Sequence, residues 1–138
     1  MNEYTFDEIK TGFTESFLVK ITEEKMAAFE GITGDTNPLH KDSNYAKEKG
    51  YRDRVVYGML TTSLISTLAG VYLPGKYSLI SQESMMFKNP VIVGDTLKVK
   101  GTVIERNEKF KFITLKVEIT NQNNEIVVFG KMDVGVTM

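Results

Sequence analysis

The chain has 138 residues, with seventeen basic and eighteen acidic side chains and a formal net charge of −1. This length suits one domain with a core of its own, and we expect a single domain over residues 1–138. The charges are spread along the chain without a basic stripe, which argues against a nucleic-acid partner. Cysteine is absent and His40 is the only histidine, so disulfides, thiolate catalysis and cysteine or multi-histidine metal sites are excluded.

The first part of the chain predicts one strand and then helices. The N-terminus is acidic and has no apolar stretch, so we expect no signal peptide and a cytoplasmic protein. Residues 13–21 suit a first strand, and Thr22 with two glutamates after it opens a helix. Two short helices are expected next, one from Pro38 and one over residues 44–49.

An uncharged segment from Val55 to Gly75 is about as long as a membrane span. It contains several serines, threonines and glycines, and Leu60, Leu64 and Leu68 recur at helical spacing. We therefore predict a helix over residues 59–73 that is buried inside a water-soluble fold, with no membrane partner.

The rest of the chain has the pattern of strands. Alternating apolar and polar residues between Ile113 and Thr120 have the period of a half-buried strand. Four strands are predicted: Ser78–Phe87, Thr96–Asn107, Lys109–Asn121 and Glu125–Val136. One long buried helix followed by long antiparallel strands indicates an α+β fold with the sheet wrapped around the helix.

The run Gly34-Asp35-Thr36-Asn37-Pro38-Leu39-His40 places a carboxylate and the only imidazole five residues apart. Such a pair can hold a water and deprotonate it near neutral pH. Asn37 is a good N-cap for a helix that starts at Pro38. The alternative is purely structural, with Asp35 bonding its own backbone in an Asx-turn before a capped helix and a surface histidine.

This run, extended back to Ile32 and followed by Ala46, resembles the motif of the MaoC-like or (R)-specific enoyl-CoA hydratase family. Further matches follow in the expected order over nearly the whole chain. They are Gly58-Met59-Leu60, Ser66, Leu73-Pro74-Gly75 and Phe87-Lys88-Asn89-Pro90-Val91 running into Gly94-Asp95. The resemblance implies the hotdog fold, an antiparallel sheet around a long central helix. It also implies a homodimer whose two sheets form one continuous sheet, or a higher homo-oligomer.

The resemblance also implies a reaction, the addition of water to a trans-2-enoyl-CoA or the reverse dehydration. Asp35 and His40 would hold the water, and the N–H of Gly58 at the start of the helix would stabilise the enolate oxygen. The substrate would be an acyl-CoA thioester. Neither a metal nor a cofactor is expected, because the thioester carbonyl already conjugates with the double bond. Three basic side chains are candidates for the phosphates of CoA, or ordinary solvated charges: Arg52, Arg54 and Lys88.

Four further residues are candidates for substrate binding. Ser66 matches an active-site serine of the family, although it lies eight residues beyond Gly58 and a serine can also bond back to its own helix. Asn37 would brace the loop as well as cap the helix, and Met59 would line an adaptable acyl pocket or join the core. Tyr57 stands where many relatives carry histidine, so its role is the main departure from the family pattern.

Two other classes of function stay open at this point. Thioesterases and acyl-carrier-protein dehydratases share the fold, but they generally place a carboxylate on the central helix. No Asp or Glu occurs between Val55 and Gly75, which counts against them. A non-catalytic acyl-CoA binding module is the other alternative, and the intact Asp35 and His40 pair argues against it.

Overall fold

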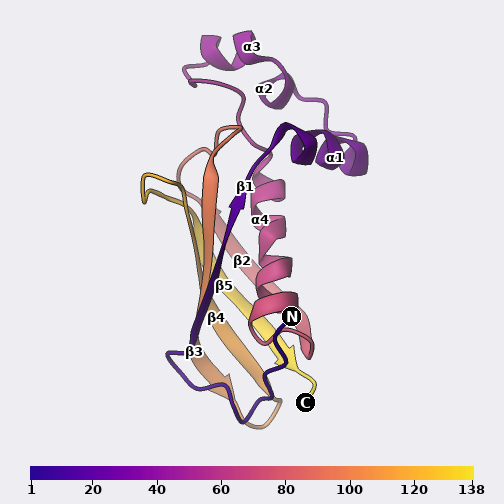
Figure 1. The fold of residues 1–138 in the computed structure, drawn as a ribbon, viewed down its shortest axis with the longest axis vertical. Helices are drawn as coiled ribbons and strands as arrows, with labels where there is room; N and C mark the ends of the chain where they lie inside the picture. Colours follow the sequence, from indigo (N-terminus) through magenta and orange to yellow (C-terminus); the bar gives the residue numbers. More distant parts are fainter.

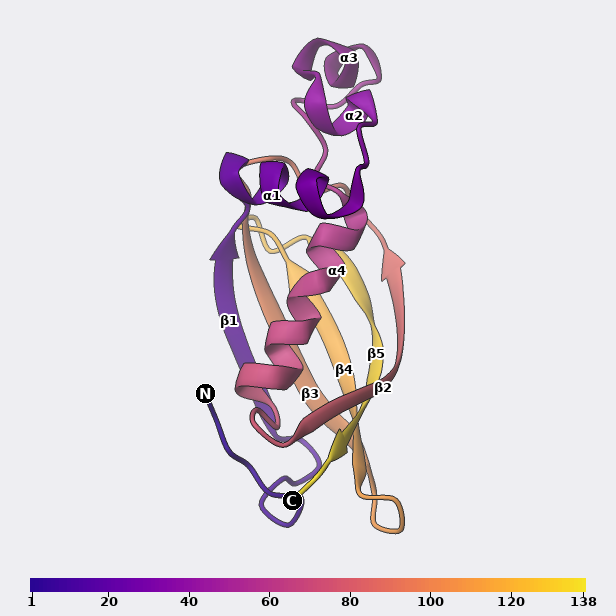
Figure 2. The same ribbon diagram turned by 90° about the vertical axis from the view of Figure 1, so that its right-hand side faces the viewer.

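The computed structural model describes residues 1–138, which form one antiparallel sheet with a long helix lying across one of its faces (Figures 1 and 2). The strand order is β1-β3-β4-β5-β2, and every neighbouring pair is antiparallel. The strands are β1 (Thr14–Lys20), β2 (Ser78–Phe87), β3 (Thr96–Asn107), β4 (Phe112–Thr120) and β5 (Ile126–Val136). The predicted α+β architecture is confirmed, and β1 and β2 are the two edges of the sheet.

Three helices lie at one end of the sheet (Figure 2). Along the chain they come after β1 and before the long helix. They are α1 (Glu23–Thr33), α2 (Pro38–Lys41) and α3 (Ser43–Glu48). The Thr22 hydroxyl accepts a hydrogen bond from Lys25 N at 3.3 Å, so the predicted start of α1 is confirmed. Gly34 ends α1 with φ 72°, a conformation that glycine adopts at little cost.

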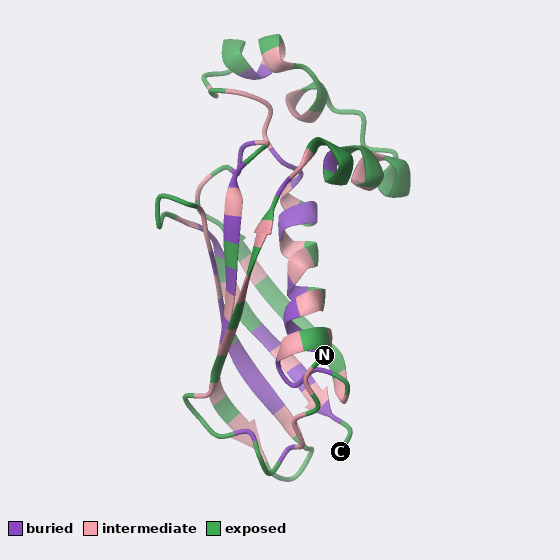
Figure 3. Ribbon diagram, in the orientation of Figure 1, coloured by how far each residue is buried: buried purple, intermediate pink, exposed green.

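The long helix α4 (Gly58–Thr67) continues into a π-helical turn over Leu68–Tyr72. The helical run therefore matches the predicted one, except that its last turn is wider, with Leu73 N bonded to Leu68 O at 2.8 Å. No helix of the protein is both long enough and apolar enough to span a membrane. The predicted burial of the helix holds for one face of α4 only, because Met59, Ser63 and Ser66 are exposed in the single chain. Figure 3 shows the exposed parts of this helix on the side away from the sheet.

The core lies between α4 and the concave face of the sheet. Alternate residues of β4 point towards the helix and are fully buried, among them Leu115 and Val117. Leu68 packs where helix and sheet come closest, because a Cβ atom at Gly101 of β3 would lie 3.0 Å from Leu68 Cδ2. The close approach of the helix to the sheet thus depends on the missing side chain at Gly101.

Several strand boundaries differ from the prediction, two of them because of backbone conformation in the turns. β4 begins at Phe112 rather than Lys109, since Lys111 occupies the left-handed region with φ 53° and ends the preceding turn. β5 begins one residue late because Asn124 has φ 59°. β4 also ends one residue early, at Thr120, and β1 is one residue shorter at each end than predicted. β2 and β3 have the predicted bounds.

Leu68 is fully buried, so Leu68→Ala should lower the free energy of unfolding by about 2–5 kcal/mol through lost burial and a cavity. Leu18→Ala is the matched control, because Leu18 is 71% exposed on β1 and should change stability by less than about 0.5 kcal/mol. Urea denaturation followed by circular dichroism measures both. Equal losses in the two variants would contradict this account of the core.

Candidate functional site

The loop between α1 and α2 is shaped by two side-chain caps. Asp35 Oδ1 accepts from Asn37 N at 3.0 Å, forming the Asx-turn that the sequence allowed. Asn37 Oδ1 accepts in turn from Leu39 N at 2.9 Å, which caps α2 with Pro38 in its first turn, as predicted. These bonds use one carboxylate oxygen of Asp35 and leave the other, Oδ2, free.

The ring of His40 is held by a backbone carbonyl. Its Nδ1 lies 2.7 Å from Val55 O, and a carbonyl only accepts, so Nδ1 carries the proton. In the neutral ring Nε2 then has a lone pair, and it lies 3.9 Å from Asp35 Oδ2. That distance is too long for a direct hydrogen bond, yet a water placed about 2.8 Å from both atoms would bridge them.

Tyr57 lies directly behind this pair and is only 2% exposed. Its hydroxyl donates to the backbone O of Asp35 at 3.0 Å, and its ring centroid lies 4.2 Å from that of His40. Burial raises the pKa of Tyr57, and the carboxylates of Glu30 and Asp35 raise it further. The phenol therefore stays a neutral donor, and Tyr57 touches both members of the pair at once.

The N-terminus of α4 provides free backbone donors. Neither Gly58 N nor Met59 N bonds to a protein acceptor, and Tyr57 gives no side-chain cap to the helix. A Cβ atom at Gly58 would lie 2.9 Å from Phe87 Cε1, so a larger residue would push against this ring. Free N–H groups and the helix dipole both favour negative charge at this point.

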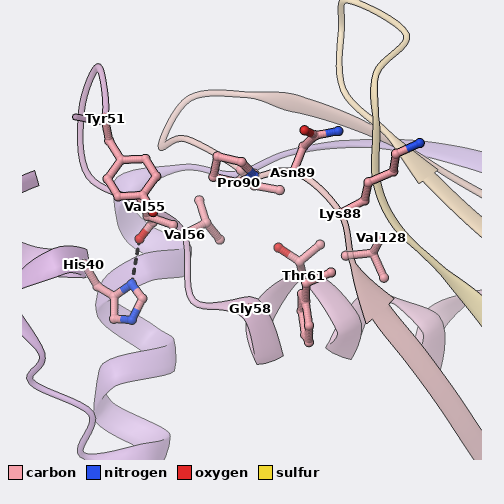
Figure 4. A pocket seen from close by; sticks show the side chains of 12 residues that line it. His40, Tyr51, Val55, Val56, Gly58, Thr61, Lys88, Asn89, Pro90 and Val128 are labelled. Atoms are coloured by element: carbon pink, nitrogen blue, oxygen red, sulfur yellow. Dashed lines mark hydrogen bonds between the residues drawn. The ribbon is translucent and has the colours of Figure 1, made fainter. Parts of the chain in front are cut away.

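Two cavities meet at this helix end. The larger, about 480 Å³, is lined by Asp35, His40, Tyr57, Gly58 and Met59, together with Phe29, Thr33 and Phe87. The smaller, about 270 Å³, shares His40, Gly58 and Phe87 with it and extends past Thr61 to Lys88 and Asn89 (Figure 4). The structure thus brings five of the seven predicted site residues around one space.

The other two predicted residues lie apart from it. Ser66 is on the exposed face of α4 and lines neither cavity, and Asn37 is exposed with its side chain engaged in the cap. The carbonyl of Val55 and the hydroxyl of Thr61 belong to the site but are not among the residues predicted from the sequence. A sequence does not indicate which backbone carbonyl faces a site. Nothing in the sequence distinguishes Thr61 from the other threonines and serines of the uncharged helix.

The charged groups nearby are mostly paired. Arg52 lies 2.7 Å from Asp95, and Arg54 pairs with Glu23, whereas Lys88 has no carboxylate partner and lines the smaller cavity. No three His, Cys, Asp or Glu side chains come together anywhere as metal ligands would.

Known proteins of similar sequence identify the family of this chain. The family model described as a MaoC like domain matches residues 6–125. The chain belongs to the MaoC-like family. This MaoC-like protein is 34% identical over 129 residues to an (R)-specific enoyl-CoA hydratase of Rhodospirillum rubrum, covering 94% of this chain and 89% of the relative. It is 37% identical over 107 residues to the enzyme of the same name from Aeromonas caviae, covering 78% of this chain and 80% of the relative.

Solved structures of similar proteins share the fold. An unliganded R-hydratase from Pseudomonas aeruginosa superposes with a TM-score of 0.90 at 29% identity, covering 96% of this chain and 84% of that one. The (R)-hydratase of Aeromonas caviae involved in PHA biosynthesis gives 0.89 at 33% identity, covering 93% and 97%. The predicted family and the hotdog fold are therefore confirmed for this MaoC-like chain.

Tyr57→Phe removes the hydrogen bond to the Asp35 carbonyl and keeps the ring, so it should lower the free energy of unfolding by about 1 kcal/mol. Tyr45→Phe is the control, because Tyr45 on the short helix α3 makes a hydrogen bond through its backbone N and none through its hydroxyl. Its effect should stay within about 0.5 kcal/mol. Urea unfolding curves of the two variants compare them directly, and equal stability would mean that the Tyr57 hydroxyl does not hold the loop.

Proposed function

We propose that this protein is an (R)-specific enoyl-CoA hydratase, which adds water to a trans-2-enoyl-CoA to give an (R)-3-hydroxyacyl-CoA and catalyses the reverse dehydration. The observation that carries the proposal is the gap of 3.9 Å between His40 Nε2 and Asp35 Oδ2, which opens on the same cavity as the free N–H of Gly58. Relatives 34% and 37% identical that bear this name support the substrate class.

Asp35 and His40 act as one unit on a shared water. The lone pair of Nε2 and the free Oδ2 both accept from the water, which orients its oxygen towards the β-carbon of the substrate. One of the two groups takes a proton as the oxygen attacks. The pair then delivers this proton to the α-carbon on the same face, so the addition is syn and the pair returns to its starting state. No group other than this pair is needed to exchange protons.

The thioester oxygen becomes negative as the water adds, and the N–H of Gly58 stabilises this negative charge. This N–H has no protein acceptor, and it lies at the positive end of α4. Removal of one such donor typically raises a reaction barrier by about 2.7–4 kcal/mol. Because the donor is a backbone group, it is already in place before the substrate binds.

The remaining predicted residues have supporting roles in this proposal. Met59 is 73% exposed and lines the mouth of the larger cavity, which suits contact with the substrate. Asn37 keeps the Asp35 loop in shape through its cap, and Tyr57 fixes the backbone and ring of the pair from behind. Ser66, exposed on α4, is assigned to a stretch of the pocket that a second copy of the chain would enclose.

Asp35→Asn and His40→Gln should each lower turnover of crotonyl-CoA by about 10²- to 10⁴-fold, because each removes one acceptor of the shared water. Both variants should keep the fold, since Asn at 35 can still accept from Asn37 N in the Asx-turn. Loss of the conjugated thioester absorbance measures the rate, and chiral analysis of the product identifies the (R)-alcohol.

Thr36→Ala is the control for these two variants, because Thr36 is exposed in the same loop, and it should retain nearly full activity. Ser66→Ala should reduce activity less than either change in the pair. Near-full activity in Asp35→Asn or His40→Gln, with an unchanged circular dichroism spectrum, would refute the proposed mechanism.

We propose further that residues 1–138 form one hotdog domain that works as a homodimer paired along β2. This strand is an edge of the sheet, with almost every residue exposed in the single chain. Its exposed apolar side chains are Leu79, Ile80, Met86 and Phe87, and Met59 lies exposed on the adjacent α4. An unprotected apolar edge of this kind is normally covered by another chain. Pairing two β2 edges about a two-fold axis would continue the sheet and cover this face.

Leu79→Glu should convert the dimer into a monomer, because it places a charge among the exposed apolar side chains that the second copy would bury. Leu18→Glu on the opposite edge strand is the control, since the two leucines are 66% and 71% exposed in the single chain. Light scattering after size exclusion measures the mass of each. A monomeric wild type at micromolar concentration, or two variants that dissociate equally, would contradict pairing along β2.

A further inference from the structure

Tyr57 makes a second contact with the site besides its hydrogen bond to the backbone of Asp35. Its ring lies against the imidazole of His40, with the two ring centroids 4.2 Å apart and the ring planes tilted by 31°. Tyr57 is also the main departure of this chain from the family pattern. A phenol, unlike an imidazole, does not take up a proton near neutral pH. Tyr57 therefore presents an uncharged aromatic face to His40.

Three neighbours of the His40 ring favour a positive charge on it. Nδ1–H donates to Val55 O at 2.7 Å (Figure 4), and such a bond becomes stronger when the ring is charged. Asp35 Oδ2 lies 3.9 Å from Nε2, but the side chain of Asp35 is 45% exposed, so water screens this attraction. The third neighbour is the face of Tyr57, and the side chain of His40 is only 15% exposed.

The contact between the two rings lies away from solvent. The face of an aromatic ring has a negative electrostatic potential and attracts a cation within about 6 Å of the ring centroid. This attraction is stronger where both groups are withdrawn from water. Tyr57 is 2% exposed, and Phe29 packs against it with ring centroids 5.0 Å apart. Water therefore screens the contact of His40 with Tyr57 less than its contact with Asp35.

Resting on the function proposed above, we propose that the face of Tyr57 stabilises the positive charge that His40 gains when it takes a proton from the shared water. The proton goes to the lone pair of Nε2 as the water oxygen bonds to the β-carbon, and it leaves Nε2 when the α-carbon is protonated. The attraction is greatest while the ring is charged, so it stabilises the reacting state more than the resting enzyme. Tyr57 exchanges no proton and is a positioning residue that acts through His40.

A series of fluorinated rings at position 57 tests this inference, because each fluorine weakens the negative potential of the ring face and changes the ring size little. Phenylalanine and its mono-, di- and trifluorinated forms replace Tyr57 in the full-length protein. Turnover of crotonyl-CoA should fall stepwise along the series, by about tenfold from the first member to the last. The control is the same series at Phe17, which stacks on Tyr72 with ring centroids 4.8 Å apart, and it should show no trend.

Because His40 is the only histidine, it gives a second readout that needs no turnover. Proton–carbon NMR spectra follow the single imidazole signal as the pH is changed. Each fluorine at position 57 should move the titration of this signal to lower pH, because the charged ring loses part of a favourable contact. The charged groups around the two rings, Asp35, Glu30, Lys41 and Arg54, are the same in every member of the series.

Turnover and titration that stay constant along the series would overturn the inference and leave Tyr57 with a purely structural role. Equal trends at positions 57 and 17 would also overturn it, because they would reflect a general effect of fluorine on the fold. A folded wild type that does not hydrate crotonyl-CoA would overturn the proposed function. The titration of His40 distinguishes that failure from a failure of the ring contact, because it does not depend on the reaction.

Discussion

The hydrogen bond from His40 Nδ1 to the carbonyl of Val55 is the contact on which the site depends. Val55 is also tied to α2, because its N–H donates to Leu39 O at 3.1 Å, and it forms an isolated antiparallel bridge with Ile92. Only two residues separate Val55 from Gly58, the first residue of α4. One short stretch of backbone therefore fixes the tautomer of the imidazole and its distance from the free donors of the helix.

That stretch is itself supported from outside the cavities. The carboxylate of Asp95 is 3% exposed and accepts from Ile92 N at 3.0 Å, from Arg52 at 2.7 Å and from Gln122 at 2.9 Å. These bonds shape the turn that pairs with Val55, so Asp95 acts on the site only through the backbone. Arg52, one of the candidates for the phosphates of CoA, thus uses one guanidinium donor to shape this turn.

Most of the fold follows from patterns that are local in the sequence. The alternation of apolar and polar residues along β4 and the apolar repeat of α4 indicate which face of each element is buried. Capping residues such as Thr22 indicate where helices start. The loop around Asp35 was predictable for the same reason, since an Asx-turn and an N-cap involve neighbours only. The contact of Tyr57 with Asp35 spans 22 residues and follows from the packing of α4 against the loop. The open face of α4 could not be predicted either, because an uncharged helix can be covered by its own chain or by a partner.

The site differs from the rest of the core in what it leaves unpaired. Gly58 N, Met59 N and Thr61 Oγ1 lie within one helical turn, and none of them has a protein partner. Bonds back to the helix satisfy the hydroxyls of Thr62 and Ser63 close by, so the chain has the means to pair such groups. Unpaired donors weaken the folded state, but they are in position before a ligand arrives and need no rearrangement when charge develops. The first turn of α4 thus holds two backbone donors ready for water or for a bound molecule.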